Sequence, residues 1–266
     1  ALILENKVEF ANTTKREFNG ARSYEFSLFS EFGSKVEAID YSIKHLKAWM
    51  KPEKRKTNKP MNFLGGKGQV RHFPKGVVGI ISPWNLPFGL TVAPLTSALA
   101  AGNRALLKPS EFVPETAALF AEVVPKYFSK DEVAVVTGGA EISQQFAELP
   151  FDHLLFTGST RVGAQIMQAA SKNLVPVTLE LGGKSPVIIG RSANLELAGT
   201  RLTFSKFLNG GQLCLSPDYV LVPRELEEQL VARVMHEAQS MYPNVTENED
   251  YAGVINERHF ARLQNY

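Results

Sequence analysis

The feature that most constrains the fold is a regular alternation of short β-branched runs with helix-forming segments between residues 77 and 180. The runs predicted to be strands are residues 77–82, 104–107, 133–136, 153–156 and 175–180. The helices predicted between them include residues 90–101, 114–128 and 159–171. Alternation of this kind is typical of a parallel β-sheet with helices on both of its faces. We therefore predict an α/β fold.

The two flanks of this region follow different patterns. Upstream, Val36, Ile39 and Ile43 begin an apolar stripe at helical spacing, which predicts an amphipathic helix over 34–50, followed by a basic loop over 51–59. Downstream of Gly183, strands are expected at 186–189 and 219–222, with a helix at 225–241. We place a domain boundary near residue 183, which gives one domain over 1–183 and the start of a second α/β domain over 184–266.

Composition excludes several classes of function. The 266 residues are 44% hydrophobic and carry 29 basic and 27 acidic side chains, so the charge gives no reason to expect a nucleic-acid partner. One cysteine rules out an intramolecular disulfide and fits a reduced cytosol, so we expect a cytoplasmic protein. The five histidines are scattered, which predicts no metal site. Apolar stretches are interrupted well below the ~20 residues of a membrane helix.

Several polar residues follow the predicted strands, where ligands of such sheets collect. Asn85, in the rigid turn Pro83–Pro87, offers N–H donors for a developing oxyanion, although asparagine is also common in turns. Lys108 and Glu111 could reach ribose oxygens or form a solvated loop. Gly158 and Ser159 either bind a pyrophosphate at a helix N-terminus or form an ordinary strand-to-helix turn.

Two further segments could carry chemistry. Glu180 lies at the end of an apolar strand, shortly before two glycines. It is either a base that faces a cleft or an exposed carboxylate at a strand end with no catalytic role. The following Gly-Lys-Ser is not a P-loop, because Thr178 stands where that motif needs glycine. Cys214 follows Asn209-Gly210-Gly211-Gln212-Leu213, whose glycines allow backbone N–H groups to face an oxyanion. A free cysteine is also commonly a small buried apolar side chain.

Taken together and in this order, the segments resemble the aldehyde dehydrogenase family. The matching pieces are PWNLPFG (83–89), AGNRALLKPSE (101–111), FTGSTRVG (156–163), TLELGGKSP (178–186) and NGGQLC (209–214). They cover about 130 residues, weaker likeness extends over nearly the whole chain, and LELGGKSP is the most specific piece. The runs NLVPVTLELGGKSPVI and CLSPDYVLVP are most similar to the coniferyl aldehyde dehydrogenase branch.

The resemblance implies a Rossmann-like cofactor domain, a catalytic domain and an arm near 58–75 that pairs subunits into a homodimer or a dimer of dimers. It implies that Cys214 is the nucleophile, Glu180 the general base, and Asn85 the oxyanion donor together with the Cys214 N–H. It implies binding of NAD, with NADP as the alternative. The cofactor-binding residues that it implies are Ser82, Trp84, Lys108, Glu111, Gly158, Ser159 and Gly182. The substrate implied is an aromatic or medium-length aldehyde.

The sequence departs from the family pattern in two places. Leu213 and Leu215 flank the cysteine, where many members have small or polar residues. The family's later Glu-Ile-Phe-Gly-Pro-like segment, which grips the nicotinamide ribose, is missing, as are the C-terminal half of the catalytic domain and the last arm strand. We therefore expect the chain to be a fragment of a longer enzyme. An isolated 266-residue chain should have little or no activity, which robust NAD reduction by the purified chain would refute.

Three other functions compete with aldehyde oxidation to the acid. The first is that the protein forms the same thioester but transfers its acyl group to coenzyme A instead of to water. Glu180 argues against this, because a base that activates water favours hydrolysis. A cysteine hydrolase would need a histidine partner, and none lies in a recognisable motif. A dinucleotide-binding protein that inherited the fold without catalysis would be indifferent to loss of the Cys214 thiol.

Overall fold

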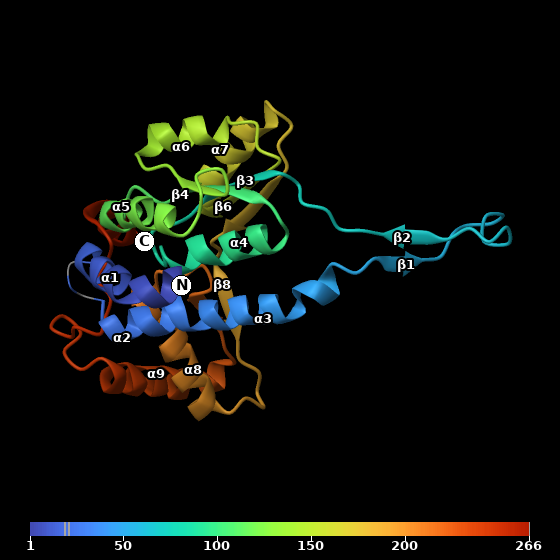
Figure 1. The fold of residues 1–266 in the computed structure, drawn as a ribbon. Helices are drawn as coiled ribbons and strands as arrows, with labels where there is room; N and C mark the ends of the chain where they lie inside the picture. The colour runs from blue at the N-terminus through green and yellow to red at the C-terminus, as the bar shows by residue number, and fades with distance from the viewer. Residues whose placement is uncertain (19, 21, 266) are drawn as a thin grey trace.

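A five-stranded parallel sheet forms the centre of the computed structural model, which describes residues 1–18, 20 and 22–265 (Figure 1). Its strands are β3 (Val77–Ile81), β4 (Arg104–Lys108), β5 (Val133–Val135), β6 (His153–Gly158) and β7 (Val177–Leu181). They lie in the order β5-β4-β3-β6-β7, and each neighbouring pair is parallel. The five predicted strands are confirmed to within a few residues at each end.

Helices cover both faces of this sheet, as the alternation predicted. On one face α4 (Gly89–Ala100) and α5 (Pro114–Val123) share a core with Ile80. On the other, α6 (Ala140–Ala147) and α7 (Thr160–Ser171) share a core with Ile81. Successive strand residues thus enter opposite cores, which is why these strands read as continuous apolar runs. The Rossmann-like α/β class is confirmed.

Two helical segments differ from the prediction for local reasons. The helix expected over 114–128 ends at Val123 and continues as a 3-10 turn, Val124–Lys126. Pro125 has no N–H to donate within an α-helix, and this favours the change. The short α6 was not predicted, because its eight residues are too few for a clear apolar stripe.

The N-terminal residues form helices that pack beside α4 and α5. These are α1 (Leu2–Glu17), α2 (Tyr24–Ser27), the π-helical turn η1 (Leu28–Gly33) and α3 (Ser34–Trp49). The predicted amphipathic helix over 34–50 corresponds to α3. Phe10 of α1 contacts Phe88 and Phe120, with 4.7 Å between ring centroids in each pair.

Phe88 lies at the centre of this aromatic core and provides a test of it. Its side chain is fully buried, and its ring centroid is 4.4 Å from that of Phe32. We expect Phe88→Ala to destabilise the protein by about 3–5 kcal/mol, because the lost ring leaves a cavity among residues from three segments. Thermal and urea unfolding would measure the change. The exposed Phe29→Ala, away from the arm, is the control, and equal unfolding midpoints for the two variants would contradict the packing described here.

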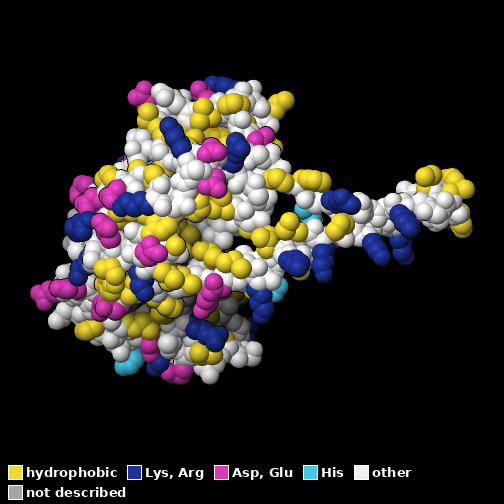
Figure 2. Space-filling model, viewed as in Figure 1, with side chains coloured by type: hydrophobic (Ala, Val, Ile, Leu, Met, Phe, Trp, Pro, Cys, Tyr) yellow, Lys and Arg dark blue, Asp and Glu magenta, His cyan; other side chains and the backbone are white. Residues whose placement is uncertain are grey.

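Strands β1 (Glu53–Arg55) and β2 (Gly68–Val70) form an antiparallel ladder that extends away from the rest of the molecule (Figures 1 and 2). The prediction of a loop over 51–59 is therefore wrong for residues 53–55. Three charged residues carry no strand signal of their own, and their partner strand lies more than ten residues further on. Phe63 and Leu64, between the strands, are 75% and 76% exposed.

The residues after Gly183 form a smaller α/β unit. Its strands β8 (Ser185–Ile188) and β9 (Pro217–Leu221) are parallel. Its helical elements are α8 (Leu195–Phe207), η3 (Leu208–Gly211), η4 (Arg224–Leu226), α9 (Glu227–Met241) and α10 (Glu257–Gln264). Ile189, Leu195 and Leu230 form a core of their own. The position of the domain boundary near residue 183 stays a prediction. Within the described part of the chain, no helix has the length and hydropathy to cross a membrane.

Candidate active site

The carboxyl edge of the central sheet brings several predicted site residues together. In the sheet register Ile81 lies beside both Lys108 and Phe156, and Thr157 lies beside Glu180. Lys108 and Gly158 end β4 and β6, Ser82 follows β3, and Glu180 is the last residue but one of β7, so all four lie at the ends of adjacent strands. The chain order reverses between β3 and β6, and ligands of open α/β sheets bind in the crevice at such a point.

Lys108 and Glu111 form the charged part of this edge. The Lys108 side chain is fully buried, and its Nζ donates to Pro109 O at 2.8 Å and lies 4.0 Å from Glu111 Oε2. Burial lowers the pKa of Lys108, and the Glu111 carboxylate opposes that shift. The alternative of a solvated loop is therefore wrong for Lys108. Ser82 is also buried, and its Oγ accepts from Thr91 Oγ1 at 2.6 Å.

Gly158 and Ser159 form the turn from β6 into α7. Ser159 is the N-cap of α7, and its Oγ accepts from Val162 N at 3.3 Å. The side chain of Ser159 is exposed, and the first N–H groups of α7 have no partner within the helix. A Cβ at Gly182 would meet no atom within 4 Å, which leaves open space beside the turn.

The loop before Cys214 has an unusual backbone. Asn209, Gly210 and Gly211 have φ values of 52°, 61° and 73°, so three consecutive residues are left-handed. A Cβ at Gly210 would lie 2.5 Å from Ala252 O, so only glycine fits there. The loop ends at Cys214, which is exposed. The alternative that this cysteine is a buried apolar side chain is therefore wrong.

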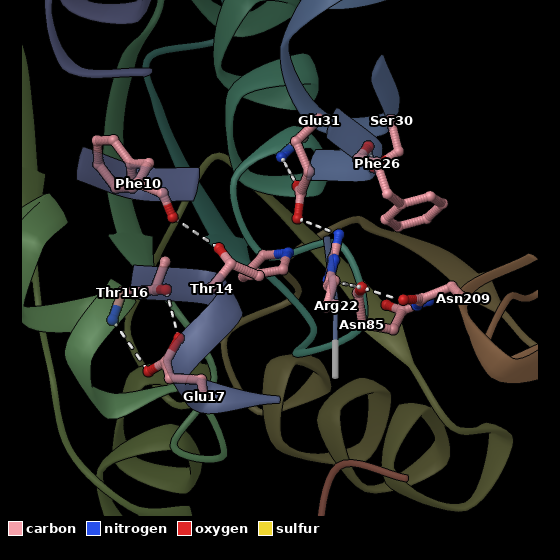
Figure 3. A network of polar contacts seen from close by, with 12 residues as sticks. Phe10, Thr14, Glu17, Arg22, Phe26, Ser30, Glu31, Asn85, Thr116 and Asn209 are labelled. Atoms are coloured by element: carbon pink, nitrogen blue, oxygen red, sulfur yellow. Dashed lines mark hydrogen bonds and ion pairs between the residues drawn. The ribbon is translucent and has the colours of Figure 1, made fainter. Parts of the chain in front are cut away.

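Asn85 is joined to this loop by hydrogen bonds in both directions. Asn85 Nδ2 donates to Gln212 O at 2.9 Å. Asn209 Nδ2 donates to Asn85 O at 3.1 Å, a contact that Figure 3 shows. An amide nitrogen carries two hydrogens, so the second N–H of Asn85 can donate to a ligand. The structure thus brings together Asn85 and the segment two residues before Cys214.

Glu180 and Trp84 have different surroundings. Glu180 is exposed, and its carboxylate makes no hydrogen bond or ion pair with the residues that the structure describes. Trp84 packs against His259 of α10, with 4.8 Å between ring centroids, and against Phe18 at 6.4 Å. Burial lowers the pKa of His259, and Arg262 and Arg258 lower it further.

Among the described residues, no three His, Cys, Asp or Glu side chains are placed to hold a metal ion.

Two residues near the site were missed from the sequence. Arg22 and Glu31 are both fully buried and form an ion pair, with Nη2 2.8 Å from Oε1. Arg22 Nη1 also donates to Asn85 O at 3.0 Å. The available signal was a lone glutamate within the apolar run Leu28-Phe29-Ser30-Glu31-Phe32, which indicates a charge that burial would require to be paired.

Comparison with known proteins agrees with this architecture. The model of the aldehyde dehydrogenase family matches residues 1–266. The coniferyl aldehyde dehydrogenase of Pseudomonas sp. (strain HR199) is 46% identical over the whole chain, which covers 54% of that protein. Three relatives named as coniferyl or probable coniferyl aldehyde dehydrogenases are 44–46% identical, which confirms the resemblance to that branch. This chain spans about half the length of the curated relatives it matches.

Solved structures give the same result. The substrate-bound state of Staphylococcus aureus AldH superposes with a TM-score of 0.87 at 34% identity, over 98% of this chain and 60% of that one. An aldehyde dehydrogenase of Mycobacterium tuberculosis complexed with NAD+ has a TM-score of 0.84 at 30% identity, over 99% of this chain and 54% of that one. The chain therefore belongs to the aldehyde dehydrogenase family.

Proposed function

We propose that the full-length protein oxidises an aldehyde to its carboxylic acid with NAD or NADP, with Cys214 as the nucleophile. The observation that carries the proposal is the 2.9 Å hydrogen bond from Asn85 to the backbone just before the exposed Cys214. This hydrogen bond joins Asn85, the proposed oxyanion donor, to the loop that carries the thiol. Asn85 itself follows β3, at the carboxyl edge of the central sheet, where ligands of such sheets bind. Membership of the family supports aldehyde oxidation.

The residues at the sheet edge fit a nicotinamide dinucleotide. The N-terminus of α7 at Ser159 offers backbone N–H groups to a pyrophosphate. The Lys108 ammonium has three donors, and Pro109 O accepts from one of them, so donors remain for ribose hydroxyls. Glu111, 4.0 Å from Lys108, can accept from the same ribose. When bound here, the cofactor supplies the hydride acceptor for the oxidation.

The roles proposed for the protein's own residues follow from their chemistry. The thiolate of Cys214 adds to the aldehyde carbon, and the oxygen that becomes negative accepts from Asn85 Nδ2 and the Cys214 N–H. Oxidation of this adduct leaves an acyl group on the sulfur as a thioester. Glu180 then removes a proton from water, which attacks the thioester and releases the acid.

Glu180→Gln should separate formation of the thioester from its hydrolysis. The amide cannot take a proton from water, so we expect steady-state turnover to fall by about 10²–10⁴-fold while the first equivalent of reduced cofactor still forms rapidly. Rapid-mixing absorbance measurements would record both phases. Glu141→Gln, on the exposed end of α6, is the matched control. Equal loss of the rapid phase and of turnover would show that Glu180 does not act as the hydrolytic base.

The aldehyde and the coenzyme preference are finer proposals. Glu111 favours NAD, because its carboxylate would repel the 2′-phosphate of NADP. An aromatic aldehyde such as coniferyl aldehyde is favoured by the 46% identical relative of that name. A panel of aromatic and aliphatic aldehydes with each coenzyme, on the full-length protein, tests both proposals. Product analysis with and without coenzyme A shows whether water or coenzyme A accepts the acyl group. If no aldehyde in the panel leads to reduced cofactor, the proposed function is refuted.

The projecting β1–β2 arm is proposed to pair subunits into a homodimer or a dimer of dimers. Phe63, Leu64 and Phe73 are exposed on it, and a second copy could cover these side chains. Figure 2 shows hydrophobic side chains gathered at its end and basic ones along its length.

A further inference from the structure

We propose that the buried Arg22–Glu31 pair is a positioning device that fixes the Asn85 peptide, and through it the direction of the oxyanion-binding amide. The inference rests on the proposed function. Neither residue contacts the proposed nucleophile. Arg22 acts through its hydrogen bond to Asn85, and Glu31 acts by holding Arg22. Figure 3 shows the pair between the N-terminal helices and the Asn85–Asn209 contact.

The pair holds both ends of the segment that carries Asn85. Arg22 Nη1 donates to Asn85 O at 3.0 Å, and Arg22 Nη2 lies 2.8 Å from Glu31 Oε1. The other carboxylate oxygen, Glu31 Oε2, accepts from Gly89 N at 2.6 Å. Gly89 is the first residue of α4, so its N–H has no partner within that helix. One ion pair therefore binds the turn at Asn85 and the helix start four residues later.

The local backbone is built around these contacts. A Cβ at Gly89 would lie 2.9 Å from Lys35 Cε and 3.3 Å from Glu31 Oε2, so glycine leaves room for the carboxylate. Glu31 lies in the π-helical turn Leu28–Gly33, a rare form found often at functional sites. The Arg22 guanidinium also lies over the rings of Phe18 and Phe26, at 4.8 and 5.0 Å from their centroids. Its position is thus fixed from several sides.

A requirement for stability alone does not explain this arrangement. Both side chains are fully buried, and burial raises the pKa of Glu31 while Arg22 lowers it. Replacing a buried ion pair by apolar side chains of similar volume is often neutral or stabilising. What apolar side chains cannot supply is directed hydrogen bonding to Asn85 O and Gly89 N.

The consequence for the reaction is geometric. Asn85 O accepts from two donors, Arg22 Nη1 and Asn209 Nδ2, which together fix the plane of the peptide. The Asn85 side chain leaves the same residue and already donates to Gln212 O. Its second N–H can then point in one direction only. A displacement of about 1 Å at such a donor can cost about 10²-fold in rate.

The test is a double-mutant cycle in the full-length enzyme. The combined variant Arg22→Met with Glu31→Leu removes both charges together, so neither is left buried and unpaired. We expect kcat to fall by roughly 10–100-fold, the cost of misplacing the donor, while the KM for the coenzyme stays within about twofold. In an Asn85→Ala background the same two changes should cost less than about threefold, because the group they position is gone.

A matched control separates this effect from the loss of any ion pair. Arg16→Met breaks the Arg16–Glu115 pair, whose atoms are 2.8 Å apart but exposed, and should leave kcat unchanged. If the combined variant does not fold, Arg22→Lys takes its place in the cycle, because an ammonium cannot reproduce the guanidinium fork that reaches Asn85 O and Glu31 at once.

The outcomes also separate the two proposals. An active wild type with unchanged kcat in the variants would overturn the positioning role alone. An equal fall in kcat with and without the Asn85 amide would also overturn it, since the effect would not pass through Asn85. A wild type that reduces no coenzyme with any aldehyde would overturn both.

Discussion

Replacement of Cys214 by alanine in the full-length protein is expected to lower aldehyde oxidation by about 10⁶-fold, a loss of the size found when a covalent nucleophile is removed. Without the sulfur no adduct or thioester can form, and the remaining groups can only bind. Absorbance of the reduced coenzyme, measured with the best aldehyde from the panel, gives the rate. The folded state should be unaffected, because Cys214 is exposed and its removal opens no cavity.

The control for this variant is coenzyme binding. The Lys108–Glu111 pair and the α7 N-terminus do not depend on the thiol, so we expect the dissociation constant for NAD to stay within about threefold. Ser216→Ala, which alters a buried hydroxyl near the same loop, tests the effect of a small local change without touching the nucleophile. Unchanged turnover in Cys214→Ala would show that Cys214 is not the nucleophile, whereas a wild type that binds NAD but oxidises no aldehyde would favour the dinucleotide-binding protein without catalysis.

Replacement of Asn85 by alanine is expected to lower kcat by about 10²–10³-fold, with a smaller change in the KM for aldehyde. The lost N–H matters most when the carbonyl oxygen becomes negative, so it lowers the barrier more than it strengthens substrate binding. The steady-state kinetics of the variant and wild type, compared over a range of aldehyde concentrations, give both constants.

This variant also removes the donor to Gln212 O, so the position of the Cys214 loop must be checked separately. The rate of Cys214 alkylation by iodoacetamide serves this purpose, because that reaction forms no oxyanion. We expect it to stay within about threefold of the wild-type rate, since Asn209 Nδ2 also reaches Gln212 O, at 3.4 Å. A fall in alkylation as large as the fall in kcat would assign the effect to a displaced loop.

Most of the central fold could be predicted because its signals are local. The strand runs, the glycines and prolines that end them, and the stripe on α3 lie within short windows of sequence. The arm strand Glu53–Arg55 could not be predicted, since its pairing with Gly68–Val70 depends on a turn through residues without strand propensity. The helix predicted to reach residue 128 ends as α5 at Val123, because Pro125 cannot donate a hydrogen bond within an α-helix and favours a 3-10 turn.

Candidate site residues could be chosen from the sequence where one segment carries the whole signal. Lys108, Ser159 and Glu180 lie at or next to the ends of strands, Asn85 lies in the proline-flanked turn after β3, and Cys214 follows a glycine-rich loop. Arg22 and Glu31 could not be found in this way, because their partners Asn85 and Gly89 lie 63 and 58 residues further on. The catalytic and cofactor roles, the oligomeric state and the cytoplasmic location stay predictions.

The side chain of Gln212 ties the nucleophile loop to a distant part of the chain. Its Nε2 donates to Gly253 O at 2.9 Å, and its Oε1 accepts from Ile255 N at 3.1 Å. During synthesis on the ribosome, residues 209–214 emerge about forty positions before these partners, which takes several seconds at ordinary elongation rates of about 5–20 residues per second. Until then the loop lacks these two hydrogen bonds, and the contacts with Asn85 tie it to the rest of the chain. The loop that carries Cys214 therefore gains its last contacts late, after all five strands of the central sheet have emerged.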